Sequence, residues 1–167
     1  LKSKAKELLE KSNVRKAPVP VEKLASALNA IVRYQPFDGE VSGLVHNQDS
    51  QAVIGVNSNH AETRQRFTIA HEIGHLLLHQ SESLHVDNQL RSVVNFRDEI
   101  SSLGVDDSEI EANQFAAELL MPEEFILRDL KEISATEPEA AVEELAQRYR
   151  VSVQSMAIRL SKLGFIR

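Results

Sequence analysis

The 167-residue chain contains no cysteine. This absence excludes disulfides, iron–sulfur clusters, thiolate zinc fingers and cysteine nucleophiles, and it is compatible with an intracellular protein. No apolar run approaches the roughly 20 residues that span a bilayer, and no signal-peptide core follows the first residues. We therefore expect a cytoplasmic protein with no membrane partner.

An excess of positive charge is also lacking. The formal net charge of −6 argues against nucleic-acid binding by the surface as a whole. The charge is uneven, because residues 145–167 hold five basic residues and no acidic one, which leaves −11 on the rest of the chain. Direct DNA binding by the basic C-terminal end therefore stays open as a lesser alternative.

Apolar patterning in the first half predicts two helices followed by strands. The helices are expected over residues 2–11 and from Pro20 to about Asn29. Three strand-like runs follow, AIVRYQ, SGLVHN and AVIGVN. Their connections are too short for parallel crossovers, so we predict a small antiparallel sheet of about three strands.

The period then changes to 3.6 residues at NSNHAETRQRFTIAHEIGHLLLH, which predicts a helix. Asn59 and Glu62 resemble a capping box at its start. Residues 81–107 are polar and weakly patterned, which predicts a long loop with a possible short strand at SVVNF.

Helices dominate the remainder of the sequence. SEIEANQFAAELLM predicts a helix with Ser108 as its N-cap, and Pro122 suits the start of another. Two more helices, over about 138–149 and 152–163, are separated by a short turn with helix-turn-helix spacing.

The sequence HEIGH, residues 71–75, places two histidines four apart with a glutamate directly after the first. On a helix, imidazoles at this spacing converge on one ion, and the glutamate can reach water bound there. We therefore predict that His71 and His75 bind Zn²⁺, with another divalent metal such as Mn²⁺ as the alternative, and that Glu72 is the catalytic base. His79 lies two turns from His71, too far to join the same site, and is interpreted as a supporting or packing residue.

A catalytic zinc usually has three protein ligands, and the third is expected from the helix that follows the polar loop. Glu109 is favoured because Asn113, four residues later, is placed to hydrogen-bond a ligand histidine. Glu111 is the alternative ligand, although its spacing from Ser108 also suits a capping box.

Two further residues near the motif are candidates for supporting roles. His85, in the polar loop, is a candidate for stabilising a tetrahedral oxyanion. Arg66 lies five residues before His71, and we expect it to form a salt bridge rather than to take part in catalysis.

The stretches RQRFTIAHEIGHLLLH and EIEANQFAAELLMP together resemble the ImmA/IrrE family of zinc metallopeptidases. APVPVEKLASALNA, SGLV, IGVN and LAQRYRVSVQSMAIRLSKLGF are also similar to that family, so the resemblance covers nearly the whole chain. It implies an α+β, zincin-like fold in which a small sheet packs on helices. It also implies that His71, His75 and Glu109 hold the metal, with Glu72 as base, and that the substrate is a helix-turn-helix repressor of mobile-element or stress genes.

These observations predict a zinc-dependent endopeptidase in two parts, a zincin-like domain of residues 1–133 and a helix-turn-helix-like helical subdomain of residues 134–167. The alternative is a non-proteolytic, metal-binding regulatory protein that binds DNA or a repressor. The presence of Glu72 favours the enzyme, because a metal sensor needs only the ligands.

Overall fold

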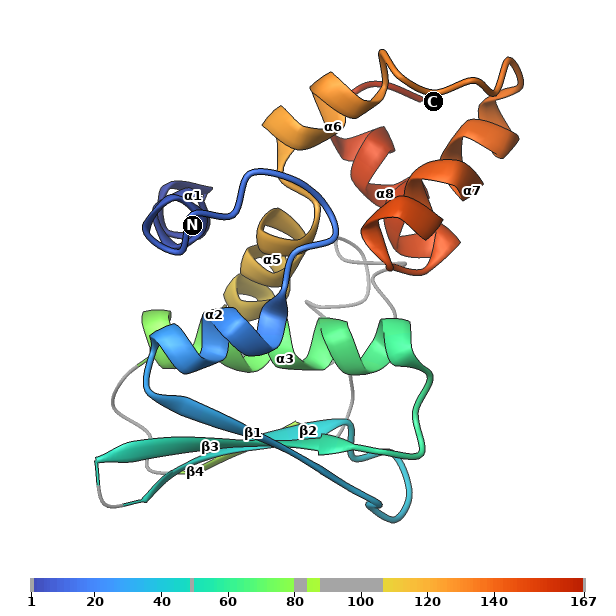
Figure 1. Ribbon diagram of the computed structural model, residues 1–167. Coiled ribbons are helices and arrows are strands. Elements are labelled where there is room, and N and C mark those ends of the chain that lie inside the picture. Colours follow the sequence, from blue (N-terminus) through green and yellow to red (C-terminus); the bar gives the residue numbers. More distant parts are fainter. Residues whose placement is uncertain (1, 49, 80–83, 88–106, 167) are drawn as a thin grey trace.

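A computed structural model describes residues 2–48, 50–79, 84–87 and 107–166. Its strands form one four-stranded sheet in the order β1-β3-β2-β4. The strands are β1 (Ala30–Gln35), β2 (Gly43–Gln48), β3 (Gln51–Asn57) and β4 (Leu84–Asp87). The described helices all lie on one face of this sheet, which confirms the predicted α+β fold (Figure 1).

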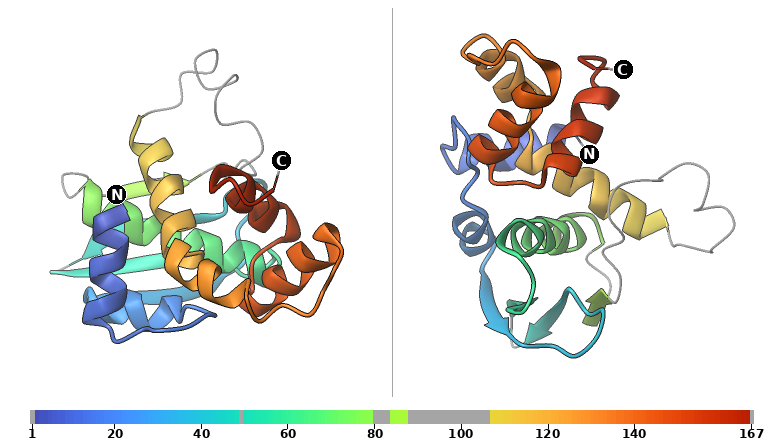
Figure 2. Two further views of the ribbon diagram at one scale, coloured as in Figure 1. Left: turned by 90° about the horizontal axis from the view of Figure 1, so that it is seen from above. Right: turned by 90° about the vertical axis from the view of Figure 1, so that its right-hand side faces the viewer.

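The helices build two layers above the sheet. They are α1 (Lys2–Lys11), α2 (Val21–Ala27), α3 (Glu62–Leu78), α5 (Asp107–Leu120), α6 (Glu123–Asp129), α7 (Pro138–Tyr149) and α8 (Val153–Lys162). Helices α2 and α3 lie next to the sheet, and α5 crosses over α3 (Figure 1). Figure 2 shows α6, α7 and α8 gathered at one end of α5. The helix that carries the HEIGH motif is therefore enclosed between the sheet and α5.

One strand pairs differently from the sequence prediction. β1 lies parallel to β3, whereas β2 is antiparallel to both β3 and β4. The prediction of a purely antiparallel sheet of three strands is therefore wrong in this detail. The chain leaves β1, skips one strand position to form β2, and returns through the hairpin as β3. Because β2 itself connects the two parallel strands, no crossover helix is needed.

The fourth strand, β4, lies within the segment that was predicted to be a loop. It is the edge strand beside β2. The strand predicted at SVVNF lies outside the described residues.

The helix positions agree with the sequence patterns, but two predicted caps are wrong. The N-cap of α3 is Ala61, without a side-chain hydrogen bond, and the backbone N–H of Asn59 donates instead to Asn57 Oδ1 at 2.9 Å. Helix α5 begins at Asp107, which places Ser108 inside its first turn. A side-chain cap does form on α8, where Ser152 Oγ accepts from the backbone N–H of Ser155 at 3.1 Å.

The hydrophobic core runs through all three layers. Ile54 of β3, Ile73 of α3 and Phe115 of α5 are completely buried. Burial of side chains of this size contributes about 1.5–3 kcal/mol each, so the core fixes α3 against its neighbours on both sides. Among the described residues, no helix combines the length and the apolar character needed to cross a membrane.

Candidate metal centre

Both motif histidines project from α3 into a buried space beneath α5. His71 is 1% exposed and His75 is 4% exposed, and their Nε2 atoms lie 3.0 Å apart. Two imidazole lone pairs this close in a buried space repel each other unless a proton or a cation lies between them. The two rings therefore lie close enough to share one proton or one bound cation.

Glu109 reaches the histidines from α5. Its Oε2 lies 3.3 Å from His71 Nε2, and its Oε1 lies 3.0 Å from His75 Nε2. Within the described ranges, these three side chains are the group whose donor atoms all lie within 4.8 Å of one another. Zinc bonds of about 2.0–2.1 Å in a tetrahedral arrangement separate neighbouring donor atoms by about 3.3 Å. The three side chains could therefore hold a divalent metal with little movement.

Asn113, one turn after Glu109, orients the first histidine. Its Oδ1 lies 2.9 Å from His71 Nδ1. The amide oxygen can only accept a hydrogen bond, so the Nδ1–H of His71 donates to it. Nε2 then keeps its lone pair and faces Glu109, which is the tautomer that a metal ligand requires.

Gly74 explains how α5 comes close enough for Glu109 to reach the histidines. A Cβ atom at this position would lie 3.1 Å from Phe115 Cδ1, 3.2 Å from Ala112 Cα and 3.3 Å from Ala112 O. These separations are shorter than ordinary carbon contacts, and two of the three involve main-chain atoms of α5. The glycine inside HEIGH is therefore part of the site, although the sequence analysis gave it no role.

Glu72 is completely buried on the side of α3 that faces β2. A Cβ atom at Gly43 of β2 would lie 3.5 Å from Glu72 Oε1 and would collide with Thr68 Cγ2 at 2.3 Å. The absence of a side chain at position 43 thus lets β2 lie directly against the helix at the glutamate. Sequence analysis missed this residue too, because nothing in the strand pattern distinguishes it.

The remaining candidates are not part of this three-residue group among the described side chains. Glu111 contacts His79, with Oε2 at 3.3 Å from Nε2, and its side chain is 48% exposed. His85 lies in β4, where it pairs with Val45 of β2. The structure thus brings Glu109, and not Glu111, to the two motif histidines.

Arg66 does not form the expected salt bridge within the described chain. It donates to the main-chain carbonyls of Arg150 at 3.1 Å, Val19 at 2.9 Å and Tyr149 at 3.5 Å. The side chain is buried, and burial lowers its pKa. Carbonyl oxygens at the end of α7 satisfy the guanidinium in place of a carboxylate.

A helix bearing His-Glu-x-x-His between a small sheet and a second helix defines the zincin-like class of fold. The family model described as the IrrE N-terminal-like domain, whose name places it among the peptidases, matches residues 25–161. The chain therefore belongs to this family, the ImmA/IrrE family.

A curated relative and a solved structure are also similar to the chain. An uncharacterised immunity region protein of Bacillus phage phi105 is 31% identical over 127 residues, which are 71% of this chain and 74% of that protein. A Mycobacterium tuberculosis transcriptional regulator matches with a TM-score of 0.60 and 19% identity, covering 96% of this chain and 46% of that one. This chain spans less than half of the regulator, and at this identity the likeness shows the fold alone.

Proposed function

We propose that the chain is a zinc-dependent endopeptidase with Glu72 as its catalytic base. The observation that carries the proposal is the convergence of His71, His75 and Glu109 from two crossed helices. Glu72, the residue after His71, is completely buried on the side of α3 that faces β2. Membership of a peptidase family supports it. The family and the cluster point to a divalent metal, and the set of two imidazoles and one carboxylate suits zinc.

In this proposal each residue has a separate task. A bound Zn²⁺ supplies polarisation of the scissile carbonyl and a lower pKa for water. His71, His75 and Glu109 hold the metal, and Asn113 keeps His71 in the required tautomer. Glu72 accepts a proton from the attacking water and returns it to the departing amine nitrogen. Glu72 is buried where α3 faces β2, and this packing holds its carboxylate in one place for both proton transfers.

The proposed substrate is a helix-turn-helix repressor. Resemblance to the ImmA/IrrE family supports this choice, as does the relative that is named for a phage immunity region. We propose the division expected from sequence, a zincin-like domain of residues 1–133 that contains the metal centre and a helical subdomain of residues 134–167. The subdomain contains α7 and α8 and would help to recognise the substrate.

DNA binding by α7 and α8 receives less support from the side chains. Arg148 pairs with Glu132 at 3.1 Å, and Arg159 pairs with Glu118 at 2.9 Å. Arg150 likewise pairs with a carboxylate, that of Glu62. Three of the five basic residues in the C-terminal stretch are thus already neutralised by acidic partners, which weakens any attraction to phosphates.

The test is to incubate the zinc-loaded protein with the transcriptional regulator encoded beside it, and separately with casein, and to measure intact masses. We expect a discrete cut in the regulator and little cleavage of casein. Glu72→Gln should keep the metal and lose about 10²- to 10⁴-fold in cleavage rate. Degradation of casein with the regulator intact would overturn the proposed substrate. Equal inactivation of the regulator by Glu72→Gln would instead support the non-proteolytic alternative.

A further inference from the structure

A buried ion pair joins α8 to the far end of the helix that carries Glu109. Arg159 donates from both terminal nitrogens to the two carboxylate oxygens of Glu118, each at 2.9 Å, and from Nε to the Met121 carbonyl at 3.0 Å. The Arg159 side chain is 7% exposed and that of Glu118 is 21% exposed. A bidentate, partly desolvated pair of this kind fixes both distance and orientation.

A second buried arginine joins the other metal helix to the same pair of C-terminal helices. Arg66 of α3 holds the carbonyls of Tyr149 and Arg150, where α7 ends and turns toward α8. The two helices that supply the metal-binding side chains are therefore each tied to the C-terminal pair through a buried guanidinium, α3 to the end of α7 and α5 to α8. The position of α3 relative to α5 therefore depends in part on the contacts of Arg66 and Arg159, which lie outside the metal centre.

The spacing along α5 shows how such a contact reaches the metal centre. The helix crosses α3 with its main chain close to Gly74 at Ala112. Glu109 lies three residues to one side of this crossing and Glu118 lies six residues to the other, which correspond to about 4.5 Å and 9 Å along the axis. If α5 tilts about the crossing, a movement of about 1 Å at Glu118 displaces Glu109 by about 0.5 Å. That displacement exceeds the roughly 0.2 Å tolerance of a metal–ligand bond.

We propose that Arg159 and Glu118 are positioning residues of the metal centre, and that together with Arg66 they make α7 and α8 a clamp that sets the angle between α3 and α5. This inference rests on the metal-binding part of the proposed function. It assigns the C-terminal helices a role in the geometry of the metal site, in addition to any role in substrate recognition. A metal-site readout distinguishes this role from a contribution to stability alone.

The test uses the full chain and measures metal binding instead of peptidase activity. Zinc affinity is obtained by competition with a chromophoric chelator, and the ligand geometry is followed in the visible absorption spectrum of the cobalt-substituted protein. Both are recorded well below the melting temperature of each variant. The variants are Arg159→Gln, Arg159→Lys, Glu118→Gln and the double variant Arg159→Gln/Glu118→Gln.

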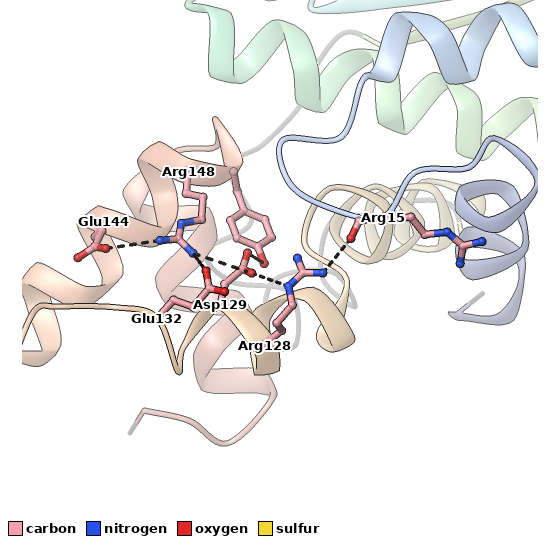
Figure 3. A network of polar contacts seen from close by, with 7 residues as sticks. Arg15, Arg128, Asp129, Glu132, Glu144 and Arg148 are labelled. Carbon is pink, nitrogen blue, oxygen red and sulfur yellow. Dashed lines mark hydrogen bonds and ion pairs between the residues drawn. The ribbon is translucent and has the colours of Figure 1, made fainter.

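Arg148 offers a matched control. It forms ion pairs with Glu132 at 3.1 Å, Glu144 at 3.7 Å and Asp129 at 3.9 Å, within a network that also ties Arg128 to the Arg15 carbonyl (Figure 3). These partners belong to α6, α7 and the chain between them, and none belongs to α3 or α5. Arg148→Gln should therefore lower the melting temperature without changing zinc affinity or the cobalt spectrum.

We expect Arg159→Gln and Glu118→Gln each to weaken zinc binding about 10-fold, the lower end of the range for residues that orient ligands, and to shift the cobalt spectrum. The double variant should bind zinc no more weakly than Arg159→Gln alone, because both substitutions remove the same ion pair. Arg159→Lys keeps the positive charge but cannot form the contact of two nitrogens with two carboxylate oxygens. Its zinc affinity should therefore lie between those of Arg159→Gln and the wild type.

Wild-type affinity and an unchanged spectrum in Arg159→Gln would overturn the clamp and leave the metal centre intact. If Arg159→Gln does not fold, Glu118→Gln decides the question alone, since it preserves the bond from Arg159 to the Met121 carbonyl. Failure of the wild-type protein to bind zinc would overturn the metal centre, and the clamp with it.

Discussion

Two histidine–glutamate contacts join α5 to α3 and to His79, the residue that caps the end of α3 one turn after His75. In the first, His71 and His75 meet Glu109, and in the second, His79 meets Glu111. The residue types are the same, and the distances overlap at 3.0–3.3 Å. The difference is that the first contact joins two buried histidines to Glu109, which is 23% exposed, whereas the second joins one partly exposed histidine to a half-exposed glutamate.

Burial and convergence, not residue type, separate the two contacts. His79 is 24% exposed and Glu111 is 48% exposed, so water screens their attraction, and a contact of this kind contributes at most about 1 kcal/mol. The buried imidazoles of His71 and His75 have little access to water, and their polar atoms are partnered by neighbouring side chains, among them Asn113 and Glu109. The three ligand side chains of the first contact already converge on one point before any metal is present. Metal binding there costs little further loss of side-chain freedom, which favours a bound metal.

The largest expected effect concerns one histidine from each contact. His75→Ala should abolish stoichiometric zinc binding, because it leaves two protein ligands where a stable site needs three. His79→Ala should leave about one zinc per chain, since this side chain lies outside the three-residue group. Metal analysis after dialysis compares the two variants directly. Zinc retained by His75→Ala, or lost from His79→Ala, would reverse the assignment of the two contacts.

The two glutamates should differ in the same way, with a smaller effect. Glu109→Gln keeps the shape but replaces a charged ligand by a neutral one, so zinc affinity should fall by more than the roughly 10- to 100-fold that follows loss of an orienting partner. Glu111→Gln removes a half-exposed ion pair and should leave affinity within about 2-fold of wild type. Chelator competition measures both constants. Comparable losses in both variants would show that Glu111 also contributes to the site.

Most elements and the central motif could be predicted from the sequence, because local periodicity and spacing determine them. The predictions over residues 2–11 and 138–149 match α1 and α7. The α+β fold and family membership followed from the pairing of HEIGH with the later helix. The parallel placement of β1 could not be predicted in this way, because it depends on which strand position the chain skips, and no local pattern records that choice.

Within the site, the spacing to Asn113 favoured Glu109 as the third ligand, but the sequence alone left Glu111 open as the alternative. Two residues apart on a helix, they point about 200° apart, so only the rotation of α5 about its axis decides which one faces α3. That rotation is fixed by packing at Ala112 and Phe115 against Gly74. Gly43 and Gly74 were overlooked for a related reason, since the need for a missing side chain becomes visible only when the neighbouring element is in place.

Asn113 provides a sharper test of how the buried contact is organised. Asn113→Ala removes the acceptor for His71 Nδ1 and should weaken zinc binding about 10- to 100-fold, because the ring loses the partner that fixes its tautomer. Asn113→Asp keeps an acceptor oxygen in nearly the same place and should restore most of the affinity. His79 lacks an equivalent partner among its described contacts. Equal affinities for wild type and Asn113→Ala would remove the asparagine from the site.

The smallest expected effect concerns Gly74, where a substitution should change zinc affinity more clearly than it changes the stability of the metal-free protein. Alanine at this position gains about 1 kcal/mol in helix propensity, but its Cβ presses on the main chain of Ala112 and on the ring of Phe115. A shift of α5 that relieves this contact should cost about 1–3 kcal/mol. The free energy of unfolding of the metal-free protein should therefore stay within about 2 kcal/mol of the wild-type value.

The required shift of α5 also moves Glu109 away from the histidines. Zinc affinity should therefore fall several-fold in Gly74→Ala, and Gly74→Val should weaken it further. The contact between His79 and Glu111 should tolerate the same shift, because the Glu111 side chain is half-exposed and has room to follow it. Thermal unfolding with and without zinc measures both effects, and a Gly74→Ala protein that binds zinc as tightly as wild type would show that close packing at this glycine does not set the ligand geometry.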